Sequence, residues 1–122
     1  MNTVETELQE VLDRSIGFQY PVDGDVFSTV LGRDVQIVNT RLYMITNDNT
    51  NGRVDCTFSF GASPDSLTDI SIVSVTVNNS WAASSIVSSS GLYTAGDTIR
   101  FTLSNVSANV KECTAVIEYI RR

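Results

Sequence analysis

One run of eight residues constrains the fold more than any other feature of the chain. From Arg53 to Phe60, apolar and polar residues alternate strictly, so that Val54, Cys56 and Phe58 share one side with Phe60. Successive side chains of a β-strand point to opposite faces, and the pattern therefore predicts a strand with one buried and one polar face. Such a strand needs partners in a sheet and a second layer that covers its apolar face.

Similar alternation returns near the C-terminus, where Ile99, Phe101 and Leu103 are interleaved with polar residues. In the last strand, Cys113 to Tyr119, every second residue is apolar or aromatic. Turn-forming residues separate these segments at 23–25, 32–34, 47–52, 61–65, 78–80 and 95–97. Short strands at this spacing predict one all-β domain, a sandwich or a barrel, over residues 17–122.

Three segments depart from simple alternation. Val35 to Thr46 changes phase, and a β-bulge near Val38 and Asn39 would restore it. Asp69 to Val77 is β-branched on both faces, as expected for a strand buried within an assembly. The last strand is also apolar on part of its second face, which indicates cover by an N-terminal helix or by a partner chain.

The first sixteen residues carry a helical period. Apolar residues recur at intervals of three and four between acidic ones, Asn2 is placed to cap the segment, and Gly17 is placed to end it. We expect a short N-terminal helical arm over residues 1–16. It either packs on its own domain or docks on a neighbouring subunit, and its apolar face is a candidate partner interface formed by Val4, Leu8, Val11, Leu12 and Ile16.

The sequence contains no recognisable motif of a catalytic or metal site. It contains no histidine, which excludes Ser-His-Asp and Cys-His catalysis. Asn47 to Gly52 resembles the start of an EF-hand loop, but the twelfth position is Phe58 instead of glutamate, and a polar hairpin loop is the better interpretation. Glycine-rich phosphate loops are absent. We therefore expect a protein that is not an enzyme and needs neither cofactor nor metal.

Two residue types leave alternatives open. Cys56 and Cys113 lie on predicted core faces, where we expect free buried thiols, with a disulfide across the sheets as the alternative. Trp81 is the single tryptophan; we expect it to plug the core, and an exposed platform that stacks a sugar is the alternative. Under that alternative Trp81 is the candidate ligand-stacking residue, with Tyr43 or Tyr93 in the same role.

Charge and hydropathy narrow the range of partners. Fourteen acidic and eight basic residues give a net charge of -6, which argues against nucleic acid as a partner. No apolar run approaches the ~20 residues that a membrane-spanning helix needs, and the N-terminus lacks a basic stretch followed by an apolar one. The sequence therefore predicts neither a membrane protein nor one exported through a signal peptide.

Four segments together resemble a known family. They are Arg41 to Thr46, Cys56 to Ser63, Gly91 to Leu103 with its Ala-Gly-Asp turn, and Ala115 to Tyr119. This set is similar to the jelly-roll decoration, cement or head-fibre proteins of tailed bacteriophages. The resemblance implies a jelly-roll-like antiparallel β-sandwich and supplies no catalytic residues. It also implies a homotrimer, made in the host cytoplasm, that binds the major capsid protein on the outer surface of the virion.

The leading hypothesis is thus a virion structural protein, a capsid decoration or cement protein that stabilises the assembled lattice. One alternative is a receptor- or glycan-binding module of a tail fibre. Another is a tail or connector component, in which the helix Val4 to Ile16 would anchor the domain to a larger assembly.

Overall fold

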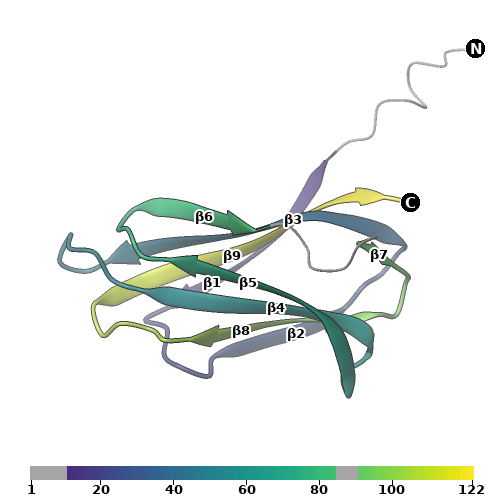
Figure 1. Cartoon of the computed structure of the whole chain (residues 1–122), viewed down its shortest axis with the longest axis horizontal. Helices are drawn as coiled ribbons and strands as arrows, with labels where there is room; N and C mark the ends of the chain where they lie inside the picture. The colour runs from purple at the N-terminus through teal and green to yellow at the C-terminus, as the bar shows by residue number, and fades with distance from the viewer. Residues whose placement is uncertain (1–10, 85–90) are drawn as a thin grey trace, which may run out of the picture.

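The computed structural model describes residues 11–84 and 91–122, and these residues form β-strands joined by turns (Figure 1). The strands are β1 (Leu12–Gln19), β2 (Val26–Val30), β3 (Val35–Thr46), β4 (Val54–Ser63), β5 (Ser66–Val75), β6 (Ser80–Ser84), β7 (Leu92–Tyr93), β8 (Thr98–Ser104) and β9 (Val110–Arg121). Within the described ranges no segment is helical, and none is a helix long and apolar enough to cross a membrane.

The strands form two antiparallel sheets that face each other (Figure 1). The first sheet has the order β1-β9-β3-β6, with the short β7 paired to β3, and the second has the order β2-β8-β4-β5. The chain passes repeatedly from one sheet to the other, so that strands distant in sequence become neighbours. This is the arrangement of a jelly roll, and the predicted jelly-roll-like antiparallel β-sandwich is confirmed.

The hydrophobic core lies between the two sheets and is built by the alternation that the sequence displays. Val54, Cys56, Phe58 and Phe60 of β4 are all fully buried, as predicted. Phe58 packs against Phe101 of β8, with ring centroids 5.1 Å apart and planes inclined by 59°, a favourable tilted arrangement. The two inward faces thus hold the sheets together.

The long strand β3 contains the predicted bulge. Its pairing with β9 shifts register between Ile37 and Asn39, which leaves Val38 as the extra residue. Ile37 before the bulge and Leu42 after it are therefore both buried. As a result, Arg41 lies on the outer face of the sheet.

The predicted helix is wrong for its C-terminal part. Leu12 and Ile16 belong to β1, which pairs with β9 along its whole length. Their separation of four residues fits one face of a helix but also one face of a strand, and pairing with β9 favours the strand because Ile16 then packs on the core. Residues 1–10, including Val4 and Leu8, lie outside the described residues. The expected domain boundary after residue 16 falls inside β1.

The loop from Asn47 to Gly52 is not a hairpin. It connects β3 in the first sheet to β4 in the second, and these two strands do not pair with each other. The turn that the polar composition predicts is present, and Asn49 has a positive φ of 60° within it. The prediction of a hairpin is wrong because composition does not reveal which strands pair, and this turn joins strands of different sheets.

Candidate functional site

The outer face of the first sheet carries a group of exposed aromatic and charged side chains. Trp81 of β6 is 47% exposed and lies directly opposite Tyr43 of β3. Their ring centroids are 4.9 Å apart, with planes inclined by 45°. The expectation that Trp81 plugs the core is wrong, because its register with Tyr43 places it on the outward side of the sheet.

A cation and two polar groups hold this aromatic pair in place. The guanidinium carbon of Arg41 lies 4.4 Å from the centroid of the Trp81 ring, a cation–π contact. The Nε atom of Arg41 lies 3.2 Å from Oε1 of Glu118, an ion pair without hydrogen-bond geometry, and Asn39 donates a hydrogen bond of 2.8 Å to the same oxygen. We call Trp81, Tyr43 and Arg41 the aromatic platform. Its side chains are fixed by one another before any ligand arrives.

The sheet beside the aromatic platform is lined with small side chains. In register with Tyr43 and Trp81, the neighbouring outward positions are Thr114 on β9 and Gly17 on β1. A Cβ atom added to Gly17 would meet nothing within 4 Å. The sheet surface is therefore shallow in this one row beside the aromatic rings, and the next outward row carries Gln19 and Glu112, which hydrogen-bond to each other. Such a surface can stack a flat ligand and hydrogen-bond to its substituents.

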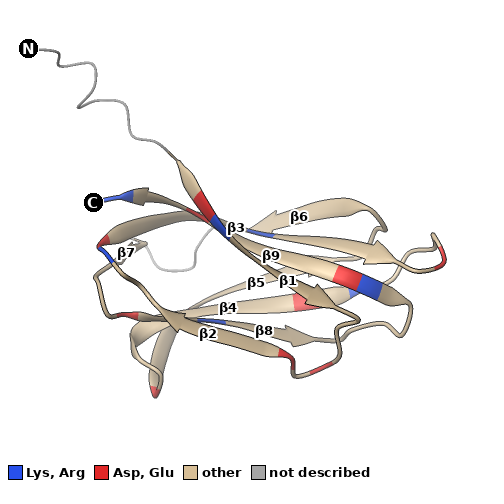
Figure 2. Ribbon diagram, turned by 180° about the vertical axis from the view of Figure 1, so that it is seen from behind, with Lys and Arg blue, Asp and Glu red and all other residues tan. Residues whose placement is uncertain are grey.

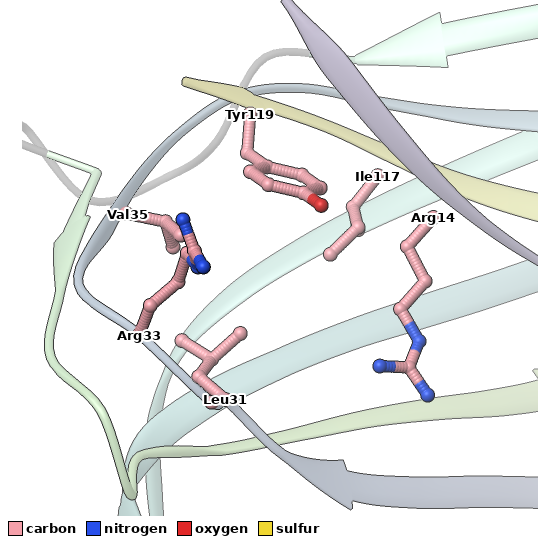
Figure 3. Close-up of a pocket in the computed structure, with 7 residues that line it drawn as sticks. Arg14, Leu31, Arg33, Val35, Ile117 and Tyr119 are labelled. Carbon is pink, nitrogen blue, oxygen red and sulfur yellow. The ribbon is translucent and has the colours of Figure 1, made fainter. Parts of the chain in front are cut away.

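A pocket of about 170 Å³ lies at a different place, at the edge of the sandwich where β1 and β2 border the two sheets (Figure 3). Its residues come from β1, the turn after β2, and the ends of β3 and β9; they are Arg14, Leu31, Gly32, Arg33, Val35, Ile117 and Tyr119. In the part of the chain that the structure describes, neither Arg14 nor Arg33 forms an ion pair. The sequence pattern does not predict this pocket, because it places Arg14 on a helix instead of on β1.

The remaining candidate residues occupy varied positions. Tyr93 is 4% exposed, and its hydroxyl donates a hydrogen bond of 2.8 Å to Asp69, so it is not available to stack a ligand. Val11 is 57% exposed, while Leu12 and Ile16 are partly buried. A partner at Val11, Leu12 and Ile16 stays a prediction.

The two cysteines are free and buried, as expected. Burial raises the pKa of Cys113 to about 12 and that of Cys56 still further, because a thiolate is poorly solvated inside the core. Both thiols are therefore protonated and unreactive at neutral pH. Among residues 11–84 and 91–122, no group of three or more potential ligands is placed to hold a metal ion.

Basic and acidic positions are interspersed along the ribbon of the described residues (Figure 2). Among the described residues, Arg41 of the aromatic platform forms an ion pair with Glu118, and Arg53 forms one with Asp55 at the start of β4.

Comparison with known proteins gives little beyond the architecture. No protein-family model and no curated protein sequence matches the chain. Among solved structures, a mitogen from Yersinia pseudotuberculosis is similar over 94% of this chain and 88% of its own, with 6% identity and a TM-score of 0.42. A family 11 carbohydrate-binding module from Clostridium thermocellum, solved with a β-1,3-1,4-mixed-linked tetrasaccharide, is similar over 93% and 83%, with 11% identity and a TM-score of 0.42.

Proposed function

We propose that this protein is a non-catalytic binding module that recognises a carbohydrate on the outer face of the β1-β9-β3-β6 sheet. The observation that carries the proposal is the half-exposed indole of Trp81, which lies on the edge strand β6 and packs against Tyr43 and Arg41 beside polar groups of the same sheet face. Tryptophan and tyrosine are enriched at binding interfaces, because each combines a large apolar ring with a polar group.

The geometry suits a sugar better than a purely apolar ligand. The apolar face of a pyranose ring stacks on an aromatic ring, while its hydroxyl groups need donors and acceptors around the rim. Glu118 and Asn39 provide such groups within the network that holds Arg41. Since these side chains are already ordered by contacts with one another, binding would cost little additional conformational entropy.

A glycan array followed by calorimetry tests this proposal. We expect the Trp81→Ala variant to lose at least about 2 kcal/mol of binding free energy, close to a 30-fold rise in Kd. The Tyr43→Ala variant should bind more weakly for the same reason, because it removes the support of the indole.

Tyr20 offers a matched control, since it is 66% exposed and does not belong to the aromatic platform. The Tyr20→Ala variant should retain the affinity of the wild type. If no glycan binds, or if the Trp81 and Tyr20 variants lose affinity equally, the proposal is refuted.

We propose capsid decoration as a second function, on a separate observation. The outer face of the other sheet exposes β-branched residues on its two edge strands: Val26 is 55%, Val30 is 57% and Ile72 is 59% exposed. Together with the resemblance to phage decoration proteins, these residues favour a surface that binds the major capsid protein on the outside of a virion. Repeated over a symmetric lattice, weak apolar contacts of this kind would add up to firm attachment.

Light scattering on the isolated protein and co-sedimentation with assembled phage capsids test this second function. A homotrimer that sediments with assembled capsids, and less so after an Ile72→Asp substitution, is the expected result. A monomer that stays in the supernatant would contradict it. The Trp81→Ala variant is informative here as well, because it should impair glycan binding and leave attachment to capsids unchanged.

A further inference from the structure

We infer that the pocket between β1 and the start of β3 binds a small carboxylate with an apolar body. The pocket is separate from the aromatic platform, because the lining residues of β1, β3 and β9 point inward whereas the platform residues point outward. The inference therefore stands independently of the proposed carbohydrate site.

The floor of the pocket is apolar. Val35 is 2% and Ile117 is 1% exposed, and the partly buried side chain of Leu31 completes this surface. The volume of about 170 Å³ is similar to that of an engineered protein cavity of about 150 Å³ that holds benzene. The pocket thus has room for a single ring or a short aliphatic chain.

The rim of the pocket is cationic and polar. Figure 3 shows Arg33 and Arg14 on opposite sides, with Ile117 between them and the hydroxyl of Tyr119 above. The guanidinium carbon of Arg14 lies 5.9 Å from the centroid of the Phe27 ring, a contact that orients this side chain across the gap between the sheets. The ligand must accordingly offer an anionic head above an apolar body.

A carboxylate fits this rim better than a neutral polar group does. A guanidinium is weakly hydrated and presents a planar fork of donors that matches the two oxygens of a carboxylate. In the described part of the chain Arg14 and Arg33 lack ion-pair partners, so a bound carboxylate would compete with no internal acid there. Either guanidinium can form the direct pair, and the second adds electrostatic attraction.

Titration of the full chain with benzoate, followed by two-dimensional NMR, tests the inference. We expect saturable shifts of the amide signals of Gly32, Arg33 and Ile117. Benzyl alcohol, which has the same ring without the charge, and inorganic phosphate, which has charge without the ring, should each bind at least about tenfold more weakly. Equal binding of benzyl alcohol, preferential binding of phosphate, or no saturable shift with benzoate would overturn the inference.

Four variants locate the site. Arg33→Gln and Arg14→Gln should each weaken benzoate binding by about tenfold or more, because a charge-assisted hydrogen bond or its supporting charge is lost. Leu31→Trp should abolish binding by filling the apolar floor while both charges remain. Arg100→Gln, on the outer face of the other sheet, is the matched control and should bind as the wild type does. Retained affinity in both the Arg33 and Leu31 variants, with well-dispersed spectra, would refute the site.

Discussion

Gly61 in β4 is the position where one added methyl group should damage the fold most clearly. It is buried at an irregular part of the β4–β5 hairpin, where the register shifts on both sides of it. A Cβ atom at this position would lie 1.8 Å from the carbonyl oxygen of Ser66 and 2.8 Å from Cα of Leu67. Both are backbone atoms, so no side-chain rotation relieves the overlap, and the two strands must move apart.

Overpacking that forces the backbone to move costs up to about 3 kcal/mol, and we expect a Gly61→Ala variant to reach this value. For a domain of this size 1 kcal/mol corresponds to about 4 °C in Tm, which predicts a decrease of about 12 °C in thermal unfolding followed by circular dichroism. Gly17→Ala is the control: the added atom meets nothing within 4 Å, and replacing a strand glycine should leave Tm unchanged or raise it slightly. Equal Tm values for the two variants would refute the reasoning.

Two further predictions concern ionisable groups. Burial alone would raise the pKa of Asp55, but hydrogen bonds from Arg53 and Asn105 outweigh it and lower the pKa below its usual value. These bonds therefore stabilise the fold above about pH 4, and the Tm difference between wild type and an Asp55→Asn variant should shrink as pH falls below that value; a constant difference from pH 7 to pH 3 would contradict this. Because the pKa values of Cys56 and Cys113 are raised, iodoacetamide at pH 8 should label neither thiol in the folded protein and both after denaturation, as mass spectrometry would show; rapid labelling of the folded protein would contradict it.

The core could be predicted from the sequence because its signal is local. Phe58 and Phe101 each lie in a strictly alternating segment, and the side that alternation assigns to the core is the buried side. The bulge in β3 could be predicted for the same reason, since a change of phase within one strand is visible without knowledge of its neighbours. Strand faces and bulges are properties of short segments.

The aromatic platform could be predicted only in part. The inward phase of Leu42 and Met44 implies that Arg41 and Tyr43 face outward. The sequence does not indicate that Trp81 pairs opposite Tyr43, because strand pairing in a jelly roll joins segments that are far apart in the chain. Without an aromatic residue close by in sequence, Trp81 is predicted to lie in the core, whereas its aromatic neighbour lies on the adjacent strand.

The edge pocket could not be predicted, because the spacing of apolar residues in β1 fits a helix as well as a strand. Leu12 and Ile16 are four residues apart, a separation that suits both helix and strand, and the acidic residues before them favoured a helix. In a helix, Arg14 would have belonged to the solvated face. In the strand it shares the inward side with Leu12 and Ile16, at an edge where the side chain reaches the gap between the sheets.

The single extra residue at Val38 makes β3 tolerant of one particular change in chain length. Ile37 and Asn39 pair with Tyr119 and Glu118, which are consecutive on β9, so Val38 is the residue without a partner in this ladder. Removing Val38 would turn the bulge into regular pairing, with Leu42 still facing the core and Arg41 still facing outward. Homologues that lack a residue at this position should therefore keep the same core and the same aromatic platform.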